Sequence, residues 1–134
     1  PLRMLRAVNF ASRFGFKIEP NTMKLIQTNA SKIKEIPSER ILIEFDKIVH
    51  KGNSKIGAQV LKDTGLFSEI FGFDLKQSII DRSPFEEVRS VGEFIFLMTR
   101  LLQNPSEFYL NKFSKLKNDP WHENCYNSVI CKFF

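Results

Sequence analysis

Apolar residues recur along this chain of 134 residues at the spacing of an α-helix, within segments bounded by proline or glycine. One segment shows the pattern simply, because its apolar positions lie three, four and three residues apart: Met23, Ile26, Ala30 and Ile33. Strand-like alternation of apolar and polar residues is absent from the sequence. We therefore predict an all-α fold, a bundle of about seven to eight short helices.

Prolines and glycines give the expected ends of the first helices. The predicted ranges are 1–14, 20–36, 38–52, 54–63 and 66–71, followed by a loop through about residue 82. Gly15 stands where a helix ends in the left-handed conformation, and Gly52 closes the third helix. Pro20 suits a first helical turn, whereas Pro37 ends the helix before it.

Three positions in the last third of the chain combine a helix-capping residue with a following proline. At the first, Ser83 is followed by a proline and then by Glu86, which is the arrangement of a capping box. The others begin at Asn104 and Asp119. The sequence therefore predicts three further helices from these positions, the first of them reaching about Leu102.

Positive charge is concentrated in the first part of the chain. Residues 1–51 hold ten Lys or Arg against five Asp or Glu, whereas residues 52–134 hold ten against ten. The whole net charge of +5 therefore belongs to the first part. A localised positive surface favours a polyanionic partner, although a solvated helix face is an equally good interpretation of charge alone.

The first predicted helix has arginine on its polar face. At 100° per residue, one arc is apolar and holds Met4, Leu5, Ala7, Val8 and Ala11. The opposite arc holds Arg3, Arg6, Phe10 and Arg13. The two alanines of the apolar arc predict that another element packs closely against this side, with the arginines on the side away from it.

Several classes of site are not expected. No apolar run approaches the roughly 20 residues that cross a bilayer, so no membrane partner is predicted. Cys125 and Cys131 are too few for a disulfide framework and favour a reducing, intracellular compartment, cytoplasmic or organellar. Together with His122 they supply too few ligands for zinc. His50 and His122 have no readable catalytic partner, so no catalytic or metal residue is predicted.

The opening stretch PLRMLRAVNFASRFGFKIEPNT resembles a helix of class II tRNA nucleotidyltransferases, the CCA-adding enzymes, and of the related bacterial poly(A) polymerases. In that family the helix follows the catalytic head and reads Glu-Asp-x-x-Arg, then Arg-Ala-x-x-Phe-Ala-x-x-x-Gly-Phe. The matching residues are Arg3, Arg6, Ala7, Phe10, Ala11, Gly15 and Phe16. A second family motif, with Glu-Arg-x-x-x-Glu, resembles the stretch from Ser38 through Arg40 to Glu44. The resemblance covers about residues 1–75.

The chain departs from the family in three respects. The acidic pair that should precede Pro1 is not in the sequence, and Asn9 stands where arginine is usual. No Asp-x-Asp follows a Gly-Ser lead, and in the family that motif belongs to the α/β head and holds two Mg²⁺ ions. We therefore expect a piece of a longer protein from which the head is absent, and which is inactive alone.

The resemblance implies roles for six residues. Arg3 would hydrogen-bond to the base edge of the incoming CTP or ATP, with Arg6 beside it in the nucleotide-binding region. Arg40 and Glu44, four residues apart, would form an ion pair that supports this helix, or else a plain surface pair. Arg13 and Lys17 would be weaker RNA contacts. The alternative for Arg3 is an exposed salt bridge, and for Arg6 and Arg13 it is pairing with acids of the neighbouring helix or of the head.

These observations predict a part of a tRNA nucleotidyltransferase that adds CCA to tRNA 3′ ends. Residues 1–52 would be the neck, with the nucleotide-selecting and supporting helices, and residues 53–134 a segment of the helical body. The expected partners are tRNA, CTP, ATP and the missing head, with Mg²⁺ in the whole protein. The alternatives are a poly(A) polymerase of the same superfamily and a non-catalytic helical RNA-binding module.

Overall fold

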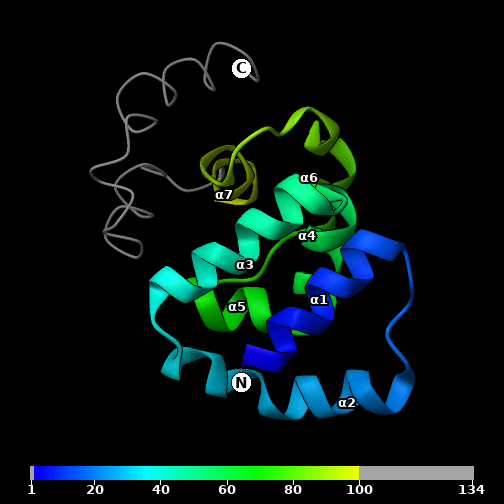
Figure 1. The fold of residues 1–134 in the computed structure, drawn as a ribbon, viewed down its shortest axis with the longest axis vertical. Helices are drawn as coiled ribbons and strands as arrows, with labels where there is room; N and C mark the ends of the chain where they lie inside the picture. The colour runs from blue at the N-terminus through cyan, green and yellow to red at the C-terminus, as the bar shows by residue number, and fades with distance from the viewer. Residues whose placement is uncertain (1, 100–134) are drawn as a thin grey trace.

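The computed structural model describes residues 2–99, and every regular element within that range is helical (Figure 1). The elements in chain order are α1 (Leu2–Phe14), α2 (Pro20–Asn29), the 3₁₀ helix η1 (Ala30–Glu35), α3 (Ser38–Lys51), α4 (Ser54–Asp63), α5 (Leu66–Phe71), α6 (Gln77–Arg82), the 3₁₀ helix η2 (Phe85–Glu87) and α7 (Val91–Thr99). The all-α prediction is confirmed. The helices predicted from Asn104 and Asp119, and both cysteines, lie outside the described residues.

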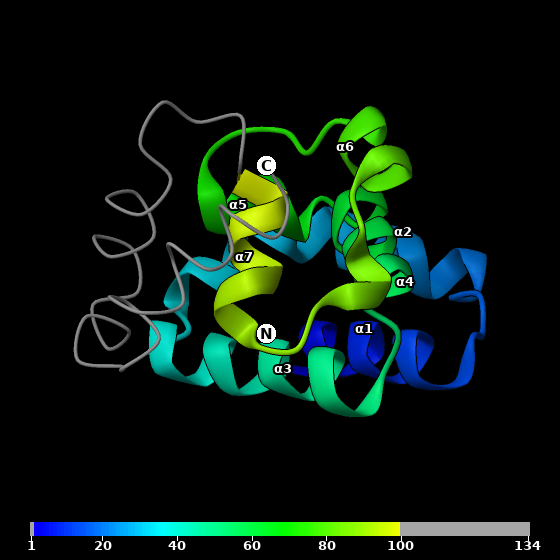
Figure 2. The same cartoon turned by 90° about the horizontal axis from the view of Figure 1, so that it is seen from above.

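Helix α3 packs against both α1 and α7 and lies between them in Figure 1, whereas Figure 2 shows it along one side of the described residues. Its side chain Phe45 is completely buried. The Phe45 ring meets Phe94 of α7 edge to face, with centroids 5.8 Å apart, and stacks on Phe71 of α5 at 6.3 Å. Burial of a phenylalanine contributes about 1.5–3 kcal/mol, so this aromatic group is a main source of stability for the core.

Two glycines allow helices to approach α3 and α1 closely. A Cβ on Gly57 of α4 would lie 2.5 Å from Cγ2 of Ile48 on α3. A Cβ on Gly52, which follows α3, would lie 2.4 Å from Oγ of Ser12 on α1. The next residue, Asn53, donates its backbone N–H to the Ser12 carbonyl at 2.9 Å. The end of α1 is therefore fixed by the turn between α3 and α4.

The predicted ends of the first helices agree with the structure. Gly15 has φ of +71° and donates its N–H to the Ala11 carbonyl at 2.9 Å, which ends α1 in the left-handed conformation. The N–H of Gly52 bonds to the Ile48 carbonyl at 3.1 Å and closes α3. The second predicted helix is divided, because the α-helix ends at Asn29 and a 3₁₀ helix continues to Glu35.

The prediction from residue 72 onward is partly wrong. The predicted loop contains a helix, α6. The helix predicted to start at Ser83 begins only at Val91 and is preceded by a short 3₁₀ turn. The Ser83 hydroxyl is buried and makes no hydrogen bond among the described residues, so it caps nothing. Ser90 caps α7 instead, because its Oγ accepts the Glu93 N–H at 3.2 Å.

The buried hydrophobic cluster includes residues from both sides of Gly52, from Met4 on α1 to Met98 on α7. Residues on both sides of the predicted boundary at residue 52 therefore contribute to one hydrophobic cluster, although the excess of positive charge ends there. The division into two domains stays a prediction. Among residues 2–99, no helix is long and apolar enough to cross a membrane.

Candidate nucleic-acid interface

Helix α1 has one buried face and one exposed cationic face, as its sequence predicts. Its inward side chains are Met4, Leu5, Val8 and Ala11, all of them buried. Arg3, Arg6 and Arg13 are exposed. Within residues 2–99, none of these arginines forms an ion pair with a carboxylate. Three guanidinium groups on one face therefore keep their charge and their donors available for a ligand.

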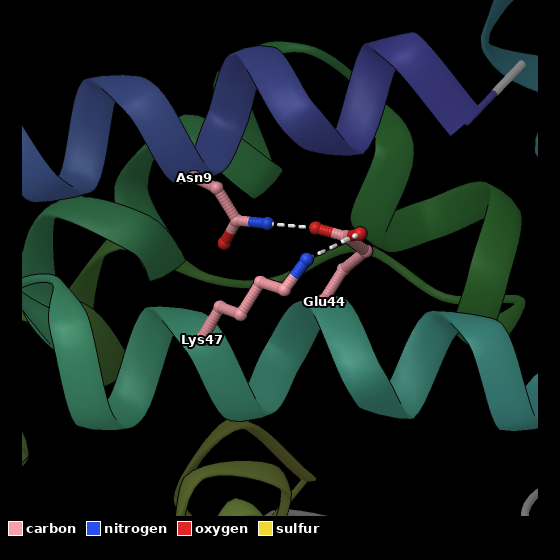
Figure 3. Close-up of polar contacts among 3 residues, drawn as sticks. All are labelled: Asn9, Glu44 and Lys47. Carbon is pink, nitrogen blue, oxygen red and sulfur yellow. Dashed lines mark hydrogen bonds and ion pairs between the residues drawn. The ribbon is translucent and has the colours of Figure 1, made fainter.

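A buried carboxylate joins α1 to α3 beneath this face. Glu44 of α3 is 3% exposed, although its helix neighbours on the solvent side are charged. The side-chain amide of Asn9 on α1 donates a hydrogen bond to Glu44 Oε2, and Lys47 Nζ lies 3.4 Å from Oε1 (Figure 3). Figure 3 shows all three side chains between the two helices. The carboxylate therefore has one neutral and one cationic partner, which is what a buried charge requires.

A cationic groove lies between α1 and α3, and the three residues of this contact form part of its lining. Its volume is about 340 Å³ and its lining residues are Arg6, Asn9, Phe10, Arg13, Glu44, Lys47 and Lys51. Four of these seven are cations, and only Glu44 is an acid. Glu44 is paired with Lys47, and the other three cations of the lining have no ion-pair partner among residues 2–99. A site of this composition attracts phosphate groups.

The expected ion pair between Arg40 and Glu44 is not formed, which corrects the prediction. Glu44 turns inward to Asn9 and Lys47. Arg40 is exposed and has no ion-pair partner in the described part of the chain. The physical reason is that Glu44 is at the border of the buried face of α3, where its carboxylate reaches Asn9 of α1, whereas Arg40 lies beyond that border and is exposed.

The other predicted site residues fall in three places. Arg6 and Arg13 line the cationic groove, whereas Arg3 is exposed on α1 outside its lining. Lys17 lines a separate apolar hollow of about 340 Å³ beside Phe16. Sequence reasoning missed Lys47 and Lys51. The two lysines are four residues apart, and they lie three and seven positions after Glu44. This spacing puts them on the helical face of Glu44, and it is the signal that could have identified them.

The described residues contain no group of three or more His, Cys, Asp or Glu that could hold a metal ion. Magnesium is therefore assigned to no residue between Leu2 and Thr99. The chemistry that this surface supports is binding: guanidinium and ammonium groups for phosphates, and the planar guanidinium of Arg3 for paired acceptors on a base.

Comparison with known proteins agrees with a nucleic-acid interface. Residues 15–73 match the family described as "Probable RNA and SrmB-binding site of polymerase A". The match contains all of α2, α3, α4 and α5, and therefore Lys47 and Lys51 of the groove. No solved structure matches the chain.

Curated relatives point to the same superfamily. A CCA-adding enzyme of Pediococcus pentosaceus is 34% identical over 119 residues, which are 89% of this chain and 27% of the relative. A CCA-adding enzyme of Lactobacillus gasseri is 41% identical over 108 residues, covering 79% of this chain and 27% of that protein. The Bacillus subtilis CCA-adding enzyme is 39% identical over 85 residues, covering 63% and 21%. The chain thus spans about a quarter of the length of these relatives.

The family match over residues 15–73 and the curated relatives agree on one assignment. The chain belongs to the superfamily of CCA-adding enzymes and poly(A) polymerases, and it represents part of the helical neck and body region.

Proposed function

We propose that this chain is part of a tRNA nucleotidyltransferase that adds CCA to tRNA 3′ ends. The observation that carries the proposal is the amphipathic character of α1. Its apolar face is buried against α3 and α4, and its opposite face presents three exposed arginines. Such a helix is held rigidly while its charged groups stay accessible, which is what recognition of a nucleotide by side chains requires.

In this proposal Arg3 reads the base of the incoming CTP or ATP. A guanidinium offers paired N–H donors in one plane, so it matches two acceptors on a base edge as a complementary base would. Arg6, one turn further along the same face, borders the cationic groove and contacts nucleotide or RNA phosphate. Arg13, together with Lys17 in the neighbouring hollow, adds weaker contacts to tRNA.

Glu44 and Arg40 have different tasks here. Glu44 supports α1 through Asn9, and so holds the helix that carries the arginines in a fixed position relative to α3. Arg40 is exposed on α3 and takes no part in this contact. The catalytic carboxylates and their two Mg²⁺ ions belong to a head domain elsewhere in the whole protein, so this chain alone is inactive.

A poly(A) polymerase of the same superfamily is the second candidate, since the matching family is described as part of polymerase A. Incorporation by the whole protein separates the two. A CCA-adding enzyme extends a tRNA that lacks its 3′ end with both CTP and ATP and then stops. A poly(A) polymerase uses ATP alone and continues. Extension by ATP only, with no CTP incorporated, would reject CCA addition.

A further inference from the structure

Three phenylalanine rings form an exposed group at the end of α1. Phe10, Phe14 and Phe16 are 59%, 49% and 61% exposed, and they account for three of the five large hydrophobic side chains that are exposed among residues 2–99. Their centroids lie 4.8 Å apart for Phe10 and Phe14, 5.8 Å for Phe14 and Phe16, and 6.4 Å for Phe10 and Phe16. The rings contact one another and leave much of their faces to solvent.

The backbone holds the rings together at this place. Gly15, with φ of +71°, turns the chain between Phe14 and Phe16, so that the two rings stack at an interplanar angle of 22°. Glycine is the residue that adopts this conformation without strain. Arg13 lies with its guanidinium carbon 5.1 Å from the Phe14 centroid, within the range of a cation–π contact.

Phe10 connects this aromatic platform, formed by Phe10, Phe14 and Phe16, to the cationic groove. It lines the groove together with Arg6, Arg13, Lys47 and Lys51, and it also lines the apolar hollow that contains Phe16. A cationic groove bordered directly by exposed aromatic faces is the composition of sites that bind single-stranded nucleic acid. Phosphates follow the cations and unpaired bases stack on the rings.

Charge complementarity selects this occupant. An apolar protein surface would meet three cations without an acidic partner at the edge of the platform, and desolvating them would cost more than the exposed rings return. A nucleotide satisfies both parts, because it carries an anionic phosphate and a flat apolar base. The family match also covers Phe16 and both groove lysines under a description as an RNA-binding site.

We infer that the aromatic platform stacks an unpaired base of single-stranded RNA whose phosphates lie in the groove between α1 and α3. This site is distinct from Arg3, which lies outside the groove lining. The inference deepens the proposed function, because it rests on an RNA substrate and specifies where an unpaired stretch of that RNA lies.

The test uses the full chain and a fluorescently labelled, unstructured RNA of about ten nucleotides, within the range that such sites cover. Binding is measured by anisotropy at several salt concentrations. A second RNA carries a fluorescent adenine analogue whose emission is quenched by stacking. The variant replaces all three phenylalanines with leucine, which keeps an apolar surface and removes the aromatic faces. Leu25→Ala, at a residue that is 64% exposed on α2, is the matched control.

The inference predicts that the triple leucine variant binds RNA about tenfold more weakly and loses the quenching, as expected from one lost stack. Its salt dependence should be unchanged, because the cations remain. Lys47→Gln and Lys51→Gln should instead each lower the slope of log affinity against log salt by about 0.7. Leu25→Ala should behave as the unchanged chain in both assays.

Equal affinity and equal quenching in the triple leucine variant would overturn the inference, as would failure of the unchanged chain to bind the RNA. Self-association through the rings with unaffected RNA binding would also overturn it and would indicate a protein interface. Helix content and thermal unfolding are checked by circular dichroism, and Phe16→Leu alone replaces any variant that unfolds. The outcome is independent of CTP incorporation by the whole protein, so the proposed function can stand if the platform does not.

Discussion

The side-chain amide of Asn9 on α1 donates a hydrogen bond to the buried carboxylate of Glu44 on α3. The two residues are 35 positions apart in sequence, and their contact is a polar link between α1, which carries the arginines, and α3. In the resembling family an arginine is usual at the position of Asn9. Here a neutral amide takes that place, and Lys47 supplies the positive charge beside Glu44.

The Asn9–Glu44 contact predicts a strong response to Asn9→Asp. A second carboxylate would replace a donor beside a residue that is 3% exposed, so the free energy of unfolding should fall by about 2 kcal/mol at neutral pH. Urea unfolding followed by circular dichroism measures the loss.

Asn21→Asp is the matched control for this change, since Asn21 is exposed in the first turn of α2. A negative charge there interacts favourably with the helix dipole, so stability should stay the same or rise slightly. Equal stabilities for the Asn9 and Asn21 variants would contradict the account of Glu44 as a buried, partnered carboxylate.

Gly57→Ala tests the close approach of α4 to α3. Alanine favours helix more than glycine does, but the new Cβ would lie 2.5 Å from Cγ2 of Ile48, which is on a stiff β-branched side chain. We expect overpacking to exceed the propensity gain and to lower the free energy of unfolding by about 1–3 kcal/mol. Thermal or urea unfolding gives the value.

Ile48→Leu provides the companion variant, because leucine has no Cγ2 on its β-carbon. The double variant Gly57→Ala with Ile48→Leu should lose less stability than the sum of the two single changes. Strict additivity of the two losses would show that the alanine methyl does not meet Ile48.

Glu19 gives a prediction for pH. The backbone N–H groups of Asn21 and then Thr22 bond to its carboxylate at the start of α2 and hold the pKa of Glu19 below its ordinary value of 4.5. A lowered pKa in the folded state means that the stabilisation is complete above pH 4.5 and is lost as the pH falls through the folded value. The melting temperature of Glu19→Gln should therefore be below that of the unchanged chain at pH 7, with the gap closing toward pH 3. A gap that stays constant from pH 7 to pH 3 would contradict this role.

The ends of α1 and α3 were predictable because local chemistry and tertiary packing agree there. Gly15 and Gly52 end helices in the sequence pattern and in the structure. Farther along, two Ser-x-x-Glu stretches compete. The first, at Ser83, also has a proline at the first helical position. The structure nevertheless uses Ser90 with Glu93, whose carboxylate accepts the Arg89 N–H at 3.1 Å. Which stretch starts the helix depends on long-range packing: Phe85 is fully buried and its ring lies edge to face with Phe94 at 6.1 Å.

The site was predictable only in part, for a similar reason. Helical periodicity placed Arg3, Arg6 and Arg13 on one exposed face, and the structure agrees. Periodicity within one helix says nothing about which helix lies opposite, so it could not show that Lys47 and Lys51 complete a groove with α1. It also paired Glu44 with Arg40, because the buried partner Asn9 lies on another element.

The most direct test of the account is nucleotide choice by the whole protein after Arg3→Ala, with Arg40→Ala as the control. Arg3 is exposed on α1 outside the groove, so tRNA binding should stay within about threefold of the unchanged protein in both variants. The account predicts that Arg3→Ala incorporates wrong nucleotides at least about tenfold more often, as expected when a bidentate base contact worth ~1–3 kcal/mol is lost. Arg3→Ala with unchanged fidelity and unchanged tRNA binding would contradict base recognition by this arginine.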